Sequence, residues 1–297
     1  MSTQPTLKLQ TRPPIEIRPP PAKPQVKPQP IKLPPPPIQK GLVKCLLIGI
    51  NYESIPYLQL YGCINDVLNV EQVLRKNYPR CKELRVLTDR TTAKPTRQNI
   101  LAGIQWLVGG LQPGQNVYIH FSGHGGKIKD ANGDEVSGED SCIHPLDGSI
   151  VETITDDEIR QVLSERIPVG CKCFAVFDSC NSGSAMDLRY CWQSPSFGKL
   201  TFTQLTNYGK TRGKVVYLSG CRDDQYAMDT VNAAGIAGGA LTNALVQTWK
   251  TYTTGLKVKH LLWDVRKCLK DNGYEQIPQI SSGIALSSEE SLNMDIY

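Results

Sequence analysis

The sequence FAVFDSCNSG at positions 174–183 decides the fold together with VYIHFSGHGG at positions 117–126. Each stretch is an apolar run that ends in small residues, and each carries a reactive side chain there, Cys180 in one and His124 in the other. Continuous apolar runs predict strands that are buried on both faces, as in a parallel sheet. Because ligands and catalytic groups gather at the carboxyl ends of parallel strands, we expect the thiol and the imidazole to meet there, as in a cysteine–histidine hydrolase.

Alternating strands and helices surround these two stretches. We predict strands at 42–50, 84–87, 117–121, 174–177 and 215–218, and helices at 66–76, 96–108, 156–166 and near 240–250 and 257–270. This alternation predicts an α/β sandwich with a mostly parallel central sheet. Two stretches interrupt it: residues 127–144 are polar and predict a loop or hairpin, and residues 192–213 have the mixed composition of a linker.

The N-terminal 40 residues differ from the rest of the chain. They hold 13 of the 21 prolines and seven of the 33 Lys and Arg residues, but only one of the 28 acids. Such a segment cannot bury enough apolar surface to fold, so we predict a disordered basic tail, residues 1–40, and a folded domain, residues 41–297. The tail is either a solvated spacer or a polyproline ligand for a partner's aromatic groove, and composition favours the spacer.

Charge and hydropathy exclude several classes of protein. The body, without the tail, carries 26 basic and 27 acidic residues, which gives no indication of nucleic-acid binding. No apolar run is long enough for a membrane span, and the basic N-terminus lacks the apolar core of a signal peptide. Most of the ten cysteines lie inside apolar runs, where reduced thiols are expected, so we predict a soluble, cytoplasmic protein.

The two motifs resemble the caspase-like clan of cysteine peptidases, and within it the metacaspases. The residues that carry the resemblance are SGHGG at 122–126, DSCNSGS at 178–184 and a third block, SGCRDDQ, at 219–225. Cys180 lies 56 positions after His124, which agrees with the spacing of about 50 residues in caspases. The resemblance covers residues 41–297 and implies a caspase-like α/β/α sandwich with a large-subunit part at about 41–191, a linker at about 192–213 and a small-subunit part at about 214–297. The short linker and the Pro-rich tail look like those of a type I metacaspase.

The resemblance assigns a role to each motif. It implies that Cys180 is the nucleophile of an acyl-enzyme mechanism and that His124 activates it and protonates the leaving amine. The backbone N–H groups of Gly125 and Cys180 are then the candidate oxyanion donors. Buried and inert side chains are the alternative for an isolated cysteine and histidine, and the matching blocks argue against it.

An acidic substrate pocket is the next implication. By resemblance, Asp66 and Asp178 form it, with Cys63 and Ser122 nearby. Two carboxylates favour a guanidinium or ammonium group, so we expect cleavage after Arg or Lys. Each acid also has a simpler explanation, because Asp66 could be a helix N-cap and Asp178 a turn former at the end of a strand.

Calcium is implied by four acids that match the metal-binding positions of the family, Asp140, Asp156, Asp157 and Asp187. Carboxylate oxygens suit Ca²⁺. The sequence Thr155-Asp156-Asp157-Glu158 is equally typical of a capping box with acids in the first helical turn, so both interpretations stay open for these two acids.

The resemblance therefore implies a monomeric, calcium-activated endopeptidase that acts on protein or peptide substrates and processes itself. Basic residues of the linker and the tail junction are the candidate self-cleavage sites: Lys40, Lys199, Lys210 and Arg212. Two alternatives are an Asp-specific caspase-like peptidase and a non-catalytic scaffold that docks partners through its Pro-rich tail.

Overall fold

A computed structural model of the protein describes residues 39–131, 133, 138–147, 152–180, 185–196, 199–220, 229–231, 237–252 and 255–295. The chain divides into two units, Met1–Pro37 and Ile38–Tyr297, and every described residue belongs to the second. The predicted tail thus lies outside the described residues, apart from positions 39 and 40. Within the described part of the chain, no helix is both long and apolar enough to span a bilayer.

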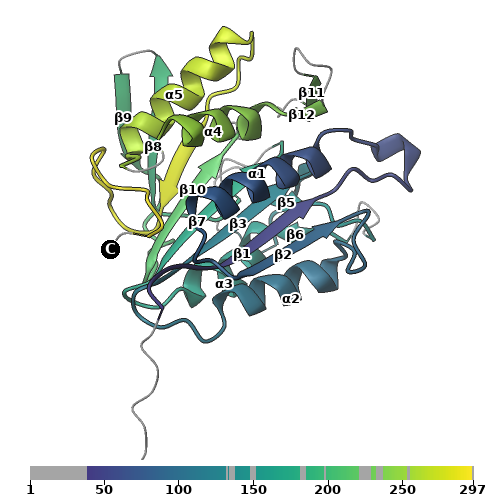
Figure 1. Cartoon of the computed structure of the whole chain (residues 1–297), viewed down its shortest axis with the longest axis horizontal. Helices are drawn as coiled ribbons and strands as arrows, with labels where there is room; N and C mark the ends of the chain where they lie inside the picture. The colour runs from purple at the N-terminus through teal and green to yellow at the C-terminus, as the bar shows by residue number, and fades with distance from the viewer. Residues whose placement is uncertain are drawn as a thin grey trace, which may run out of the picture. The chain divides into compact units, whose positions relative to one another are not determined.

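An eight-stranded sheet forms the centre of the folded unit (Figure 1). Its order is β2 (Glu83–Thr88), β1 (Gly41–Gly49), β3 (Gln115–Ser122), β7 (Lys172–Asp178), β10 (Lys214–Ser219), β13 (Gln279–Ser282), β8 (Tyr190–Ser196) and β9 (Lys199–Gln204). The first five strands are parallel neighbours, and the last three pair antiparallel. The expectation of a mostly parallel central sheet is confirmed.

Helices cover both faces of this sheet (Figure 1). One face carries α1 (Cys63–Asn77), α4 (Ala240–Thr251) and α5 (Val258–Asp271), and the other carries α2 (Arg97–Val108) and α3 (Asp156–Val162). Short 3-10 turns add η1 (Pro56–Leu58) and η2 (Ser164–Arg166). Each face has its own apolar core, because every residue of β7 is buried and its side chains alternate between the two faces.

The helix boundaries follow from local sequence. Thr96 caps α2 through a hydrogen bond from the Asn99 N–H to its hydroxyl, and the helix ends before Gly109, as its sequence predicts. Thr155 and Glu158 form the predicted capping box of α3. The predicted helix 156–166 is α3 followed by η2 rather than one continuous helix.

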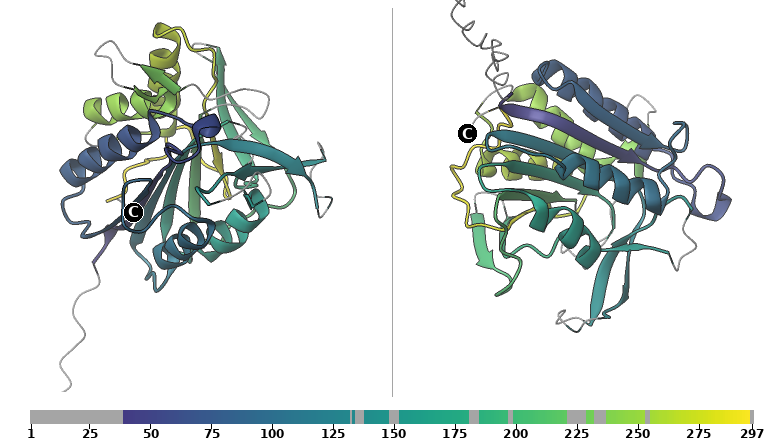
Figure 2. Two further views of the ribbon diagram at one scale, coloured as in Figure 1. Left: turned by 90° about the vertical axis from the view of Figure 1, so that its right-hand side faces the viewer. Right: turned by 90° about the horizontal axis from the view of Figure 1, so that it is seen from below.

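Two small sheets flank the central one. β4 (Gly125–Lys129) and β5 (Glu139–Ile143) form an antiparallel hairpin over the polar stretch, and β6 (Ile154–Thr155) pairs with β5. Figure 2 shows this hairpin projecting away from the central sheet. β11 (Asp229–Val231) pairs with β12 (Ala237–Gly239), which leads directly into α4.

The segment predicted as a linker, residues 192–213, is largely regular structure. Residues up to 204 form most of β8 and all of β9, which extend the central sheet at its edge. Local composition is misleading there because β9, the edge strand, exposes much of its surface and needs no continuous apolar run. Only residues 205–213 connect β9 to β10 without regular structure.

Candidate active site

The cysteine and histidine motifs meet at the carboxyl ends of two neighbouring strands. In the parallel β3–β7 ladder, Ser122 lies directly opposite Asp178. His124 therefore follows one strand end by two residues, and Cys180 follows the other by two. The turns also touch, since a Cβ atom on Gly125 would come closer than 3.0 Å to the Cys180 carbonyl oxygen. Only glycine permits this close approach, which explains the residue that follows His124.

His124 is held by three groups from the segment after β1. Its Nε2 lies 2.7 Å from the carbonyl oxygen of Leu58, and its backbone N–H donates to the Tyr52 hydroxyl at 3.0 Å. The Tyr52 ring lies 4.8 Å from the imidazole, centroid to centroid. A carbonyl oxygen only accepts, so Nε2 carries a proton. In the neutral imidazole, Nδ1 is then the atom that exchanges a proton.

Tyr52 also connects His124 to the β4–β5 hairpin. Its hydroxyl donates to the carbonyl oxygen of His144 at 2.6 Å, and the His144 N–H donates to the carbonyl of His124 at 3.1 Å. Burial raises the pKa of Tyr52, so its hydroxyl keeps its proton. Burial and the neighbouring His124 lower the pKa of His144. Neither group therefore adds a charge beside His124 at neutral pH.

The arrangement suits thiol chemistry. Cys180 and His124 are both half-buried, so solvent and a substrate can still reach them. A free thiol ionises only slightly at neutral pH, and an adjacent imidazole that takes its proton produces the reactive thiolate. The backbone of Gly125 and that of Cys180 lie side by side, as two oxyanion donors require.

Two buried carboxylates lie together beside these turns. Asp66 of α1 is fully buried, and Asp178 at the end of β7 is 5% exposed. A Cβ atom on Gly239 would come closer than 3.0 Å to the Oδ2 atoms of both, so the two carboxyl groups flank this one glycine. The structure therefore brings together the two predicted pocket acids from positions that are far apart in the sequence.

Asp66 has a structural role other than the helix cap. The N-cap of α1 is Gly62, so Asp66 lies inside the helix and the N-cap explanation is wrong. Its carboxylate accepts hydrogen bonds from the Ser122 hydroxyl at 2.7 Å and from the Gly239 N–H at 2.9 Å. Cys63 is the first residue of the same helix and is buried. The predicted pocket residues of α1 and β3 are thus neighbours.

Asp178 is oriented by a chain of hydrogen bonds. Its Oδ2 accepts from both the N–H and the hydroxyl of Thr242 at 2.8 Å. The Thr242 hydroxyl lies 3.3 Å from Nε2 of His120, and Nδ1 of His120 lies 3.2 Å from the Tyr118 hydroxyl. Since Thr242 donates its proton to Asp178, His120 donates through Nε2 and accepts from Tyr118. Asp178 is therefore fixed by tertiary contacts and is more than a turn former.

The four predicted calcium ligands are only partly gathered. Asp140 and Asp156 are both buried and act on the same thiol: burial, with a smaller contribution from these two carboxylates, raises the pKa of Cys142 to about 11. Asp156 accepts from the Ser141 N–H at 2.7 Å, and Asp157 pairs with Arg160 at 3.3 Å. Asp187 is buried with a positive φ of 44°. Among the described residues no three metal-ligating side chains lie close enough to hold an ion.

The candidate self-cleavage residues differ in their surroundings. Lys199 begins β9 and pairs with Ser196 of β8, so this residue lies in the central sheet and not in a connecting linker. Lys210 and Arg212 are exposed on the segment between β9 and β10, on either side of the buried Thr211. Lys40 is exposed directly before β1. The block at 219–225 ends outside the described residues, which include only its first two positions.

Sequence reasoning missed several residues of the site. Tyr52 and Leu58 hold His124, while Gly239 and Thr242 hold the two carboxylates. The same strand-end rule that singled out His124 and Cys180 also applies to Tyr52, which follows the end of the apolar strand β1. Thr242 and Gly239 gave no comparable signal, because they meet Asp178 only through the packing of α4 on the sheet.

A thiol and an imidazole at adjacent ends of a parallel sheet are typical of caspase-like cysteine peptidases, and known proteins agree. The family model "Metacaspase, peptidase C14 domain" matches residues 43–189. Metacaspase-1 of Schizosaccharomyces pombe is 35% identical over 290 residues, which cover 82% of this chain and 67% of that protein. Metacaspase-1 of Mycosarcoma maydis is 36% identical, with 82% and 71% covered. The chain belongs to the metacaspases, a family of cysteine peptidases.

Other relatives extend the comparison. Metacaspase-5 of Trypanosoma brucei brucei is 36% identical over 84% of this chain, but this chain spans only 52% of that protein. The crystal structure of a Geobacter sulfurreducens protein superimposes with a TM-score of 0.58 over 83% of this chain and 95% of its own. Its sequence is 20% identical, so this likeness concerns the fold alone.

Burial of His120 predicts a pH dependence of stability. Burial lowers the pKa of His120 from 6.5 to about 3, so the unfolded chain takes up this proton first as the pH falls. The contribution is present above pH 6.5 and is lost below it, by about 2 kcal/mol at pH 5. Denaturant unfolding at several pH values should show a steeper fall in stability between pH 7 and pH 5 for wild type than for His120→Gln. Equal slopes would contradict this assignment.

Proposed function

We propose that the protein is a calcium-activated cysteine endopeptidase that cleaves after Arg or Lys, with Cys180 as nucleophile and His124 as its acid and base. The contact of Gly125 with the Cys180 backbone supports the catalytic assignment, because it joins the two turns that carry these side chains. The convergence of Asp66 and Asp178 on Gly239 supports the specificity.

The reaction follows from the placement of the protons. Nδ1 of His124 takes the proton of the Cys180 thiol, and the thiolate attacks the substrate carbonyl carbon to form a tetrahedral oxyanion. As the C–N bond breaks, the imidazolium returns the proton to the leaving amine, which leaves a thioester. Water, deprotonated by the same imidazole, then hydrolyses the thioester and restores the thiol.

The preference for a basic residue rests on electrostatics. Asp66 and Asp178 place two carboxylates beside the nucleophile turn, and both accept hydrogen bonds that favour their charged forms. A guanidinium group matches carboxylates in geometry and in charge, whereas an aspartate side chain would be repelled. This argues against the Asp-specific alternative. The non-catalytic scaffold alternative does not explain why the turns that carry His124 and Cys180 lie against each other.

The first prediction concerns the catalytic pair. Cys180→Ala and His124→Ala should each lower kcat/KM for a peptide substrate by on the order of 10⁴-fold or more, because the nucleophile or its base is removed. The double variant should be no worse than either single variant, since the two side chains act as one unit. Cys268→Ala, which removes a half-buried thiol on α5, is the matched control and should keep full activity. Substantial turnover by Cys180→Ala would exclude this nucleophile.

The second prediction concerns specificity and uses reporter peptides that differ only in the residue before the scissile bond. Arg and Lys peptides should be cleaved, and the Asp peptide should not. Asp66→Asn and Asp178→Asn should lower kcat/KM for the Arg peptide by at least about 30-fold, since losing a desolvated charge partner costs about 2 kcal/mol or more.

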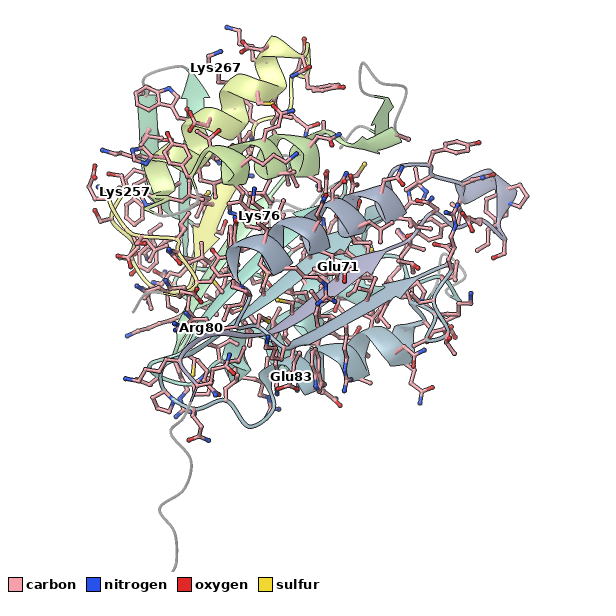
Figure 3. The ribbon with its side chains drawn as sticks, in the orientation of Figure 1. Glu71, Lys76, Arg80, Glu83, Lys257 and Lys267 are labelled. Atoms are coloured by element: carbon pink, nitrogen blue, oxygen red, sulfur yellow. The ribbon has the colours of Figure 1, made fainter. Side chains whose placement is uncertain are left out.

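Glu71→Gln provides the control for these variants. Glu71, which is labelled in Figure 3, lies on the same helix as Asp66. Its partly exposed side chain pairs with Arg75 at 2.7 Å. This substitution also removes one acid from α1 and should leave kcat/KM unchanged. Cleavage of the Asp peptide in preference to the Arg peptide would contradict the proposed specificity and favour the Asp-specific caspase-like alternative. The assignment of Cys180 as nucleophile would be unaffected.

Calcium binding is proposed at Asp140, Asp156, Asp157 and Asp187. Their carboxylate oxygens are the ligands that Ca²⁺ prefers, and the burial of Asp140 and Asp156 near the same thiol gives two of them a common location. The pair between Asp157 and Arg160 has to open if Asp157 is to bind the ion. A bound Ca²⁺ would neutralise these acids and draw their segments together.

The third prediction tests calcium and self-processing together. In Cys180→Ala, calorimetry should detect Ca²⁺ binding with a Kd on the order of 0.1 to 1 mM, and Asp156→Ala with Asp157→Ala should abolish it. Asp271→Ala, on the exposed surface of α5, is the control acid. In the active enzyme, millimolar Ca²⁺ should produce fragments cut after Lys40, Lys210 or Arg212, identified by mass spectrometry. Lys199 should be cut last, because its strand must leave the sheet first.

A different outcome would contradict each of the two proposals, calcium binding and self-processing. If replacing Asp156 and Asp157 leaves the calcium concentration for half-maximal activity unchanged, these two acids do not bind the ion and only stabilise the first turn of α3. The absence of fragments while Arg peptides are cleaved would exclude self-processing and leave the peptidase proposal intact. A cytoplasmic location, a monomeric state and a polyproline-binding partner for the tail stay predictions from the sequence.

A further inference from the structure

Two sulfur atoms lie in contact on the face of the central sheet that α1 covers (Figure 1). Sγ of Cys45 lies 3.5 Å from Sγ of Cys81, and either thiol can be the donor in this hydrogen bond. Cys45 belongs to β1 and is fully buried in the apolar core beneath α1, whereas Cys81 is half-buried. The two thiols are therefore adjacent, and solvent reaches Cys81 but not Cys45.

The course of the chain brings these two residues together. α1 ends at Asn77, and the Cys81 N–H donates to the carbonyl oxygen of Tyr78 at 2.9 Å, which closes a turn directly after the helix. β2 then pairs parallel with β1, and its Leu84 lies opposite Cys45. Because Cys81 comes shortly before Leu84, it has to pass beside β1. The helix end and the parallel ladder on either side of the turn thus fix the contact between the sulfur atoms.

Cys81 is the more reactive of the two thiols. The hydrogen bond with Cys45 lowers the pKa of Cys81, whereas the same bond, together with burial, raises the pKa of Cys45 well above its usual value. The positive charge of Arg75 also favours the Cys81 thiolate. A solvent-accessible thiol of lowered pKa beside a second thiol is typical of redox-active pairs, in which the first thiol attacks the oxidant and the second resolves the product.

We propose that Cys45 and Cys81 are a redox site that reacts with small disulfide molecules and forms a reversible disulfide bond. The Cys81 thiolate attacks one sulfur of the small disulfide, and half of that molecule leaves as a thiolate, which takes up the proton that Cys81 released. Cys45 then loses its proton and attacks the Cys81 sulfur, which expels the other half as a thiolate that takes up this proton. The two protein thiols lose two electrons in total, and the small disulfide gains them as it becomes two thiols.

The disulfide bond closes a loop in the chain. Cys45 and Cys81 are 36 positions apart, and the loop between them includes Tyr52, Leu58 and Asp66. Closing such a loop constrains the unfolded chain, so it stabilises the folded state. Cys45 lies in the middle of β1, and Cys81 follows the end of α1 that is opposite Asp66, so the bond should leave the catalytic turns in place. The proposal does not depend on the peptidase assignment.

The test uses the full-length chain with Cys180→Ala, so that neither self-cleavage nor the catalytic thiol takes part. The protein is reduced with dithiothreitol, freed of it and treated with oxidised glutathione. After the remaining thiols are blocked, mass spectrometry of non-reduced peptides should find Cys45 linked to Cys81, and dithiothreitol should reverse the link. The oxidised protein should have a Tm about 5 °C or more above that of the reduced protein.

Cys268 provides the matched control. It is also half-buried, but its Sγ contacts Oε1 of Gln247 at 3.4 Å, and burial raises its pKa. Cys268→Ser should keep both the cross-link and the rise in Tm, whereas Cys81→Ser should lose both. A time course of glutathione treatment should show that Cys81 reacts faster than Cys268, because more of it is thiolate at neutral pH.

Cys45→Ala tests the order of the two steps. Without the resolving thiol, Cys81 should retain glutathione as a stable mixed disulfide, whereas the buried Cys45 should stay unmodified in Cys81→Ser. Cys81→Ser replaces a single atom in a half-buried turn residue, so it should fold and keep the test decisive even if Cys45→Ala is unstable. Failure to find the link, a Tm rise that persists in Cys81→Ser, or equal reaction rates of Cys81 and Cys268 would overturn the proposal.

Discussion

The in-register parallel pairing of β3 with β7 is the constraint on which the site depends. Because Ser122 lies opposite Asp178, the two segments that follow must occupy adjacent space, and glycine at position 125 is what lets them touch. A shift of one residue in this ladder would turn every side chain of the shifted strand to the other face of the sheet. The buried apolar faces of both strands prevent that shift, so the same packing that stabilises the core also aligns the turns that carry His124 and Cys180.

The two carboxylates connect the halves of the chain. Asp66 and Asp178 belong to α1 and β7, yet the groups that bind them include Gly239 and Thr242, which begin α4. Their hydrogen bonds place the start of α4 beside the catalytic turns. The acidic pair that we propose for recognition of a basic residue thus also fixes the geometry of the elements around it, so its substitution should disturb the placement of α4 as well.

The sequence predicted the parallel strands well, because strands buried on both faces are continuous apolar runs, as in 117–121 and 174–177. It could not reveal β13, whose Gln279, Ser281 and Ser282 are polar and yet buried. Gln279 is accommodated there by a hydrogen bond from Gln193 of β8, a contact between residues far apart in the chain. His124 and Cys180 were identified by strand-end position, whereas Thr242 and Gly239 depend on helix packing that no local pattern encodes.

The order of the strands in the sheet differs from their order in the chain, so strands from the two sides of residues 205–213 are hydrogen-bonded to each other. β8 and β9 precede residues 205–213 in the chain, and β10 and β13 follow them, yet β10 and β13 lie between β7 and β8 in the sheet. A break anywhere in residues 205–213 would leave two polypeptides interleaved through the β7–β10 and β13–β8 ladders. Such a nicked molecule would migrate as one particle under native conditions and as two bands only after denaturation. The peptide bonds of residues 205–213 connect β9 to β10 in the chain, but the ladders between strands hold the sheet together.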